Sequence, residues 1–258
     1  MTTGENTTNG SANGNQIDLF FTPSEVSEER LKIYNVVVVD VLRAGTSIAT
    51  ALSNGARGVF PVRSIAEATA LAAQLSRDNV LLCGEREGRM IDGFNLGNSP
   101  ADYSRDRVRG RDLIFGSTNG SPAVVKASGA RCVYLCGFVN LNAVIDALLK
   151  LKNPYPLAIV CAGKLSRFSI EDAVCSGKLI ERLQERSDTK TFLNDGARTA
   201  LLLAREFGSD VLKLLRESDH GRYLIEIGME NDLPLSAADS VLPVVPALRD
   251  GKLVKLTK

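Results

Sequence analysis

The amino-acid sequence predicts an α/β protein with a three-layer α/β/α architecture, in which helices cover both faces of a largely parallel or mixed sheet. Short apolar segments alternate with segments of helical periodicity along most of the chain. Residues 36–39 form an uninterrupted valine run, which is typical of a strand buried inside such a sheet. With 258 residues, of which 44% are hydrophobic and 24% charged, the chain is long enough to bury a full core.

In the first half of the chain, capping signals and breaker residues mark the ends of the expected elements. Gly55 follows one helix, and Ser64 with Glu67 forms a capping box that opens the next. We expect strands at residues 17–21, 35–40, 58–62, 80–83 and 113–115, and helical segments at 24–31, 46–54 and 65–76. A long polar loop, 84–98, follows the fourth strand.

In the second half the alternation continues and then gives way to helices. Pro122 suits the first turn of a helix and begins one. We expect strands at residues 131–135 and 157–161 and helices at 140–150, 169–186 and 194–216, after which only 241–245 looks extended. No repeat or linker interrupts the pattern, so residues 17–258 are expected to form one domain.

Charge and composition narrow the classes of function. Lys and Arg number 31 against 30 Asp and Glu, so no general attraction to nucleic acid or to an acidic membrane is expected. Residues 1–16 are rich in Thr, Asn, Gly and Ser and lack the regions of a signal peptide, which predicts a disordered tail. No apolar stretch is long enough to span a bilayer. We therefore expect a cytoplasmic protein, and leave open whether identical subunits associate.

The cysteines and the single histidine give no metal-site pattern. Five cysteines, an odd number, lie mostly in or beside apolar strands, as buried reduced thiols do. The spacing of Cys132 and Cys136 is not that of a zinc site. His220 has no partner nearby in sequence and is interpreted as a structural residue at a helix end.

The first candidate functional loop follows the valine-rich strand. Asp40, Arg43, Thr46 and Ser47 place a carboxylate, a guanidinium and two hydroxyls just past the strand end. Loops at the carboxyl ends of parallel strands meet in a common crevice, where helix N-termini present N–H groups to negative charge. The segment therefore suits a doubly charged anion and a metal ion. Alternatively, Asp40 only caps the next helix and Arg43 pairs with a surface carboxylate.

The second candidate loop covers residues 84–100, where acidic and basic residues alternate and glycines give backbone freedom. Glu85, at the strand end, can ligate a metal ion. Asn98 and Ser99 can donate hydrogen bonds where the next helical turn begins. The alternative is a solvated turn whose charges screen one another and whose Asn-Ser pair is a cap.

The third candidate loop, residues 116–121, is a turn of small residues between a strand and a helix. Its hydroxyls and amides, including those of Thr118, Asn119 and Gly120, can surround phosphoryl oxygens. The loop lacks the lysine of a Walker motif and the glycine spacing of a dinucleotide fold, so nucleotide binding is unsupported. An ordinary turn with a serine cap remains the alternative.

The fourth candidate loop, residues 161–172, permits two chemistries. Cys161 and Arg167 have the C-x5-R spacing of cysteine phosphatases, although Val160 stands where that class usually has histidine. Glu171 or Asp172 can instead supply a further oxygen ligand for Mg²⁺. In the structural alternative, Ser169 and Asp172 belong to a capping box.

Four motifs, in their order and spacing, resemble the 2-phosphosulfolactate phosphatase family. They are DVLRAGTS from residue 40, GEREGRMIDGFNLGNSP from residue 84, STNGS from residue 117 and CAGKLSRFSIED from residue 161. The resemblance extends from about residue 35 to residue 246, and the GFNLGNSP string is its most specific part. On these motifs the chain is identified as a member of the family.

The resemblance implies a Mg²⁺-dependent phosphatase with a three-layer α/β/α fold. Such an enzyme hydrolyses 2-phospho-3-sulfolactate to sulfolactate and phosphate, a step of coenzyme M synthesis; related phosphorylated hydroxy acids are left open as substrates. Two departures stand out. The family commonly reads DVLRATT where this chain has AGTS at 44–47, and GFDLGNSP where it has Asn95. Losing a carboxylate at Asn95 is expected to weaken metal binding or shift substrate preference.

Hydrolysis of a phosphate monoester requires that the negative charge of the transferring group be neutralised. We therefore assign catalytic roles to Asp40, Arg43 and Glu85, with water attacking phosphorus in line. The metal ligands are Asp40, Glu85 and Asp172; the substrate-binding residues are Arg43, Thr46, Ser47, Asn98, Ser99, Thr118, Asn119 and Gly120, with Arg86, Arg89 or Arg167 for the sulfonate or carboxylate.

Three alternatives remain open on the sequence. Asp40 can accept the phosphoryl group covalently, although the chain lacks the DxDxT pattern of haloacid dehalogenases. Cys161 with Arg167 can act as a thiol nucleophile. A metabolite sensor that keeps the pocket but has lost turnover is the third alternative, and Asn95 is the feature that supports it.

Overall fold

The computed structural model describes residues 15–75, 79–153, 155–187 and 190–257. The predicted disordered tail therefore lies almost entirely outside the described residues, and Gln16, its last residue, begins the first strand. Within the described ranges, the strands form one mixed sheet in the order β5-β4-β6-β3-β11-β10-β7-β2-β8-β1-β9. They are β1 (Gln16–Phe20), β2 (Asn35–Val39), β3 (Gly58–Val62), β4 (Val80–Arg86), β5 (Arg89–Met90), β6 (Asp112–Gly116), β7 (Cys132–Cys136), β8 (Leu157–Cys161), β9 (Phe192–Leu193), β10 (Pro246–Arg249) and β11 (Lys252–Lys255).

The sheet consists of two parallel groups joined by an antiparallel hairpin. Strands β4, β6 and β3 run parallel to one another, as do β7, β2, β8, β1 and β9. The hairpin β10–β11 lies between them and pairs antiparallel with β7 on one side and β3 on the other. A segment from the end of the chain thus connects two halves built from its beginning and middle.

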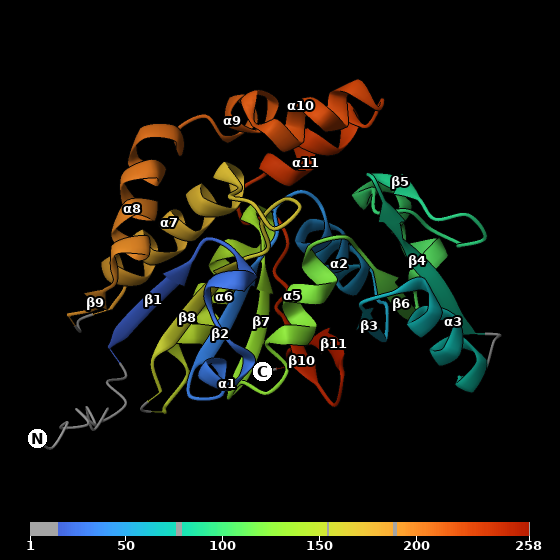
Figure 1. Cartoon of the computed structure of the whole chain (residues 1–258), viewed down its shortest axis with the longest axis horizontal. Helices are drawn as coiled ribbons and strands as arrows, with labels where there is room; N and C mark the ends of the chain where they lie inside the picture. The colour runs from blue at the N-terminus through green and yellow to red at the C-terminus, as the bar shows by residue number, and fades with distance from the viewer. Residues whose placement is uncertain (1–14, 76–78, 154, 188–189, 258) are drawn as a thin grey trace, which may run out of the picture.

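Helices cover both faces of the sheet, which confirms the predicted three-layer fold (Figure 1). They are α1 (Glu28–Leu31), α2 (Ala44–Ser53), α3 (Ile65–Gln74), α4 (Arg105–Val108), α5 (Gly120–Lys126), α6 (Leu141–Leu149), α7 (Ile170–Glu185), α8 (Asp195–Phe207), α9 (Val211–Glu217), α10 (Asp219–Glu226) and α11 (Leu233–Ala237). The valine run of β2 shows why both faces are covered. Val36 and Val38 belong to the core under α2 and α5, whereas Val37 and Val39 belong to the core under α6 and α7.

Three sequence-based expectations are wrong in detail. The first residues of the expected loop 84–98 form strands, because β4 extends to Arg86 and forms a hairpin with β5. The expected helix 194–216 is divided into α8 and α9, since Gly208 ends the first and the side chain of Asp210 caps the second. Residues 241–245 precede the terminal strands, whose hairpin turns at Asp250 and Gly251, both at positive φ.

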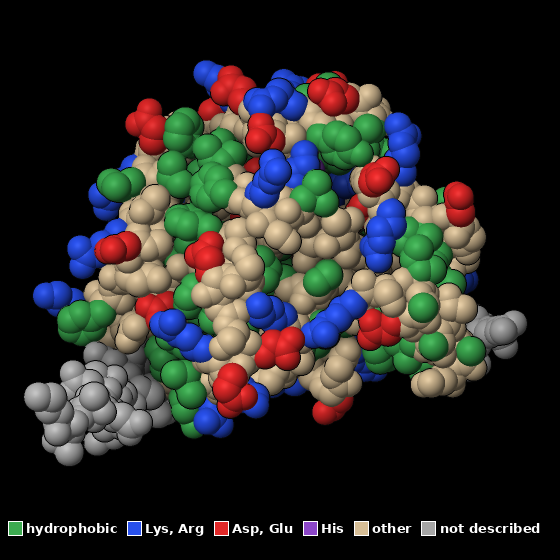
Figure 2. Space-filling view, viewed as in Figure 1, with side chains coloured by type: hydrophobic (Ala, Val, Ile, Leu, Met, Phe, Trp, Pro, Cys, Tyr) green, Lys and Arg blue, Asp and Glu red, His purple; other side chains and the backbone are tan. Residues whose placement is uncertain are grey.

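The face of the molecule in Figure 2 carries Lys and Arg interspersed with Asp and Glu, without a large region of one sign. Such a surface does not concentrate a single charge on this side of the protein. Among the helices of the described ranges, none combines the length and apolarity needed to cross a bilayer.

Candidate active site

All four candidate loops border one cavity of about 730 Å³ at the carboxyl ends of β2, β4, β6 and β8. Helices α9, α10 and α11 lie across this end of the sheet in Figure 1, and α10 supplies the remaining wall. The lining residues are Asp40, Leu42, Arg43, Glu85, Arg86, Glu87, Gly88, Asn98, Ser117, Thr118, Asn119, Lys164, Leu165, His220 and Tyr223. The expectation that these loops converge at one edge is met by the geometry.

Asp40 follows β2 directly and is 4% exposed. Its Oδ1 accepts a hydrogen bond from the backbone N–H of Ala44 at 3.0 Å, so the capping alternative is real but does not exclude a place in the cavity. Its Oδ2 faces Gly120, where a Cβ would lie 2.3 Å from that oxygen. Glycine at this position is what allows the start of α5 to approach the carboxylate.

The ionised form of Asp40 is disfavoured by its surroundings. Burial raises the pKa of Asp40 to about 6, and the neighbouring carboxylates of Glu85 and Glu171 act in the same direction while His220 opposes them. A cation or a donated proton in the cavity would relieve this cost. A buried acid with a shifted pKa inside a cleft is typical of a functional site.

Arg43 lines the cavity and is held rigidly from behind. Its Nη1 donates to Asp232 Oδ2 at 2.6 Å, and its Nη2 donates to the carbonyl of Gly88 at 2.5 Å. Both charged side chains are nearly inaccessible to solvent, since Arg43 is 3% and Asp232 4% exposed. The partner is therefore a buried carboxylate, not the surface one that the alternative assumed, and the guanidinium has a fixed orientation at the wall of the cavity that Asp40 also lines.

Glu85 is hydrogen bonded on both of its oxygens. Oε1 accepts from the backbone N–H of Thr118 at 2.7 Å, and Oε2 accepts from the N–H of Gly88 at 2.9 Å and the hydroxyl of Thr118 at 3.3 Å. Glu85 thereby joins the β4–β5 hairpin to the turn before α5. The N–H of Thr118, predicted to hold phosphate, donates to Glu85 here, so of that trio only the amides of Asn119 and Gly120 have no such partner among the described contacts.

Four predicted hydrogen-bond donors differ in their placement. Thr46 and Ser47 are fully buried in α2, where their hydroxyls donate to the carbonyls of Val41 and Asn98. They shape the loops around the cavity without lining it. The Ser99 hydroxyl donates to Asp232 and so supports Arg43. Only Asn98 lines the cavity, and its buried Oδ1 has no hydrogen-bond partner among the described residues.

Asp172 lies outside the cavity lining, and both of its oxygens are engaged. Oδ1 accepts from the N–H of Val41 at 2.9 Å and Oδ2 from that of Gly163 at 3.0 Å, which fixes two of the loops to each other. The side chain of Ser169 caps α7 at the Asp172 N–H, but the predicted capping box is only half formed, because the Asp172 carboxylate accepts from Val41 and Gly163 instead of the Ser169 N–H. Burial raises the pKa of Asp172 well above its usual range.

The remaining predicted residues lie at the margins. Arg86 lines the cavity, whereas Arg167 lines a neighbouring one of about 660 Å³. Asn95 is exposed and does not line either; its Oδ1 accepts from the N–H of Leu82 at 2.8 Å. An amide oxygen makes this bond as a carboxylate would, and Asn95 lies outside the cavity lining, so this departure removes no carboxylate from the cavity. The observation that favoured a sensor without turnover therefore loses its basis.

The geometry also disfavours the thiol mechanism. Cys161 has no exposed surface and does not line the cavity, and its Sγ lies 3.4 Å from the hydroxyl of Ser176. Burial raises the pKa of Cys161 well above its usual range, so the nucleophilic thiolate is not formed near neutral pH.

Cys161→Ala is expected to leave phosphate release within about twofold of the wild type, because the thiol only fills space in the core. Initial rates under saturating substrate check this, and thermal denaturation shows whether the variant folds. An inactive but folded variant would restore the thiol mechanism.

Lys164, His220 and Tyr223 line the cavity but were not predicted to belong to the site. The Lys164 ammonium lies 4.7 Å from the centre of the Tyr223 ring and donates to the carbonyl of Asp219 at 3.0 Å. The Tyr223 hydroxyl donates to the carbonyl of Glu87 at 2.9 Å, which links α10 to the β4–β5 hairpin. The position of Lys164 inside the fourth motif could have indicated that it belongs to the site. No sequence pattern indicated this for His220 and Tyr223, which lie in α10.

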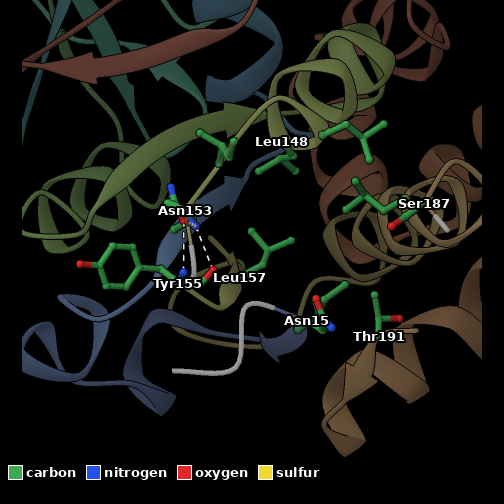
Figure 3. A pocket seen from close by; sticks show the side chains of 12 residues that line it. Asn15, Leu148, Asn153, Tyr155, Leu157, Ser187 and Thr191 are labelled. Carbon is green, nitrogen blue, oxygen red and sulfur yellow. Dashed lines mark hydrogen bonds between the residues drawn. The ribbon is translucent and has the colours of Figure 1, made fainter. Parts of the chain in front are cut away.

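A third cavity, of about 150 Å³, lies at the opposite end of the sheet, near the amino ends of β1, β2 and β8 (Figure 3). Asn153 borders it and accepts a hydrogen bond from the Asn35 amide at 2.8 Å. Leucines from the end of α6 form much of the wall. None of the predicted site residues lines this cavity.

A mixed α/β sheet whose strand-end loops enclose a charged cavity is the architecture of an enzyme that binds a small anion. The model of the family 2-phosphosulpholactate phosphatase matches residues 20–251. The chain belongs to this family of phosphoric monoester hydrolases. The matched range includes all four motifs.

Several relatives align over almost their whole length. The chain is 40% identical over 224 residues to a protein of Symbiobacterium thermophilum, covering 85% of this chain and 93% of that protein. It is 36% identical over 238 residues to a Thermotoga maritima protein, with 92% and 97% covered, and 33% identical over 238 residues to one of Clostridium beijerinckii, with 92% and 98% covered. Each relative is named "Probable 2-phosphosulfolactate phosphatase".

Proposed function

We propose that the protein is a Mg²⁺-dependent phosphatase that hydrolyses 2-phospho-3-sulfolactate, or a closely related phosphorylated hydroxy acid, to the hydroxy acid and phosphate. In the coenzyme M pathway this reaction yields sulfolactate. The observation that carries the proposal is the convergence of Asp40, Arg43 and Lys164 on one cavity. Burial disfavours the ionised form of Asp40, and the two basic residues supply positive charge in the same cavity. The names of the relatives support the substrate.

The oxygen donors of the cavity suit a Mg²⁺ ion that takes only a few of its ligands from the protein. No group of three His, Cys, Asp or Glu side chains suited to a metal ion occurs in the part of the chain that the structure describes. Mg²⁺, however, is commonly held by one or two carboxylates together with substrate phosphate and water. Asp40 and Glu85 are the carboxylates of the cavity, and the unpartnered Oδ1 of Asn98 is a further oxygen donor. When bound, the ion would neutralise charge on the phosphoryl oxygens.

Asp172 is less suited to this role than the sequence suggested. Both Asp172 and Glu85 accept backbone hydrogen bonds on each oxygen, but Asp172, unlike Glu85, does not line the cavity. We propose that Asp172 positions the loop carrying Asp40 by holding the N–H of Val41. The ligand set then reduces to Asp40, Glu85 and Asn98.

The substrate has two anionic ends, and the cavity offers cations for each. Arg43, fixed by Asp232, presents the rest of its planar guanidinium for the phosphoryl oxygens. Asn119 lines the same cavity, and Gly120 packs against Asp40 Oδ2, so we assign their amides to the phosphoryl oxygens. Lys164 and Arg86 are available to the sulfonate or carboxylate. Water then attacks phosphorus in line, and this route ranks above a covalent intermediate on Asp40.

Removal of divalent cations is expected to abolish phosphate release, because charge neutralisation dominates phosphoryl transfer. The assay measures inorganic phosphate from 2-phospho-3-sulfolactate and from 2-phospholactate, in EDTA and after addition of Mg²⁺. Full activity in EDTA would overturn the dependence on the ion. Thermal stabilisation by these compounds without any phosphate release would instead support the sensor.

A further inference from the structure

His220 occupies a position between two cavities. Its side chain is 14% exposed and belongs to the lining of the main cavity, where Asp40 lies, and of the neighbouring cavity, where Arg167 lies. It is also the only histidine of the chain. A largely buried imidazole at the wall of a cavity proposed to bind phosphate is well placed to exchange a proton with bound substrate.

Glu171 holds one side of this imidazole. The His220 Nδ1 lies 3.3 Å from Glu171 Oε1, and the carboxylate side chain is only 2% exposed. The contact is a close approach without hydrogen-bond geometry, so that oxygen has no hydrogen-bond partner in the described part of the chain. Burial raises the pKa of Glu171, but the neighbouring His220 and hydrogen bonds to the carboxylate oppose burial, and the pKa is lowered. A buried carboxylate oxygen that lacks a hydrogen bond favours a proton on the nitrogen that faces it, which here is Nδ1.

The proposed reaction needs a proton at the oxygen that leaves. The ester oxygen of a 2-phospho hydroxy acid departs as a secondary alkoxide, which is a poor leaving group unless it is protonated. Asp40 and Glu85 lie across the same cavity, and they are assigned to the phosphoryl side. Of the groups that line the cavity, His220 combines a donor nitrogen with a carboxylate that orients it.

We propose that His220 is the general acid of the hydrolysis and that Glu171 is the residue that positions it. This assignment rests on the proposed phosphatase function. Water forms the new P–O bond as the ester P–O bond breaks; the electron pair of the broken bond goes to the ester oxygen, which takes a proton from His220 Nε2. The attacking water loses one proton, and solvent returns one to His220, so the products are the hydroxy acid and hydrogen phosphate.

The test compares two substrates of almost equal shape, 2-phospholactate and its 3,3,3-trifluoro analogue. The fluorines stabilise the departing alkoxide, so this analogue needs the general acid less. His220→Gln is expected to lower kcat on 2-phospholactate by roughly 10²–10⁴-fold and on the trifluoro analogue by far less. Glu171→Gln is expected to show the same selectivity with a smaller loss.

Lys164→Met is the matched control, because Lys164 lines the same two cavities but has no role in proton transfer. It is expected to affect both substrates equally. An equal loss on both substrates in His220→Gln, or no loss, would overturn the assignment. Asp40 would replace His220 as the acid if Asp40→Asn alone showed the selectivity. Absence of phosphate release by the wild type from these two compounds and from 2-phospho-3-sulfolactate would instead overturn the proposed function itself.

A direct measurement is independent of turnover. Because the chain has one histidine, the ¹⁵N resonances of its imidazole belong to His220 without further assignment. In the full-length wild type, Nδ1 is expected to carry a proton, and Glu171→Gln is expected to remove that preference. Identical imidazole spectra in the two proteins would exclude the positioning role of Glu171.

Discussion

Asp40→Asn is expected to reduce phosphate release by roughly 10²–10³-fold or more and, at the same time, to raise the melting temperature. The loss of activity follows from the place of the carboxylate in the cavity beside Arg43. The gain in stability follows from its burial, because the pKa of Asp40 is raised from 3.8 to about 6. At neutral pH this shift corresponds to about 3 kcal/mol of unfavourable free energy.

The direction of the stability change in Asp40→Asn follows from the pH dependence of the folded state. A carboxyl whose pKa is raised by folding binds its proton more tightly in the folded state. The stabilisation from this proton is complete below the unfolded pKa, near 3.8, and is lost as the pH rises through about 6. The asparagine amide does not ionise and still accepts the N–H of Ala44. The variant should therefore match the wild type near pH 4 and exceed it at pH 7.

Thermal denaturation at several pH values measures this difference, with an expected gain of about 1–3 kcal/mol, or roughly 2–4 °C per kcal/mol. Asp92→Asn is the control, because Asp92 is an exposed carboxylate that does not line the cavity. It should change neither stability nor activity. A variant at Asp40 that is inactive and also less stable at pH 7 would contradict the idea that function is what retains this buried charge.

The convergence of the site was predictable in part from sheet topology. Within one parallel group the chain leaves each strand at the same end, which brings Asp40, after β2, to the loop after β8, and Glu85, at the end of β4, to Asn119 after β6. The two groups are joined through the antiparallel hairpin β10–β11, so strand order alone did not require them to share one cavity. The valine run of β2 and the capping residues Ser64 and Ser169 likewise act through local rules.

The direction of a side chain and the docking of distant helices could not be predicted in the same way. Thr46 and Ser47 have the right chemistry for an anion, but a helix turns their hydroxyls to the carbonyls of Val41 and Asn98. His220 and Asp232 belong to C-terminal segments whose position across the sheet depends on tertiary packing. The sequence around His220 and Asp232 did not predict that they contact residues so far away in the chain.

Arg43→Met is expected to destabilise the protein by about 3–5 kcal/mol, because it leaves the carboxylate of Asp232 buried without its cation. Their contact at 2.6 Å joins side chains that are 2% and 4% exposed, so water cannot replace the lost partner. Arg43→Lys should rescue little, since one ammonium cannot reproduce the forked contact with Asp232 and the carbonyl of Gly88.

A double-mutant cycle separates the structural role of Arg43 from its role with substrate. Asp232→Leu alone should also destabilise, whereas the double variant Arg43→Met with Asp232→Leu should recover much of the loss, because an apolar pair replaces an ion pair without leaving a charge. Denaturant unfolding measures the coupling, and additive losses would show that the pair does not act as a unit. Recovered stability without recovered phosphate release is the expected result. If the double variant regained activity, Arg43 would serve only to hold the loops, and the phosphoryl oxygens would have to find another cation in the cavity.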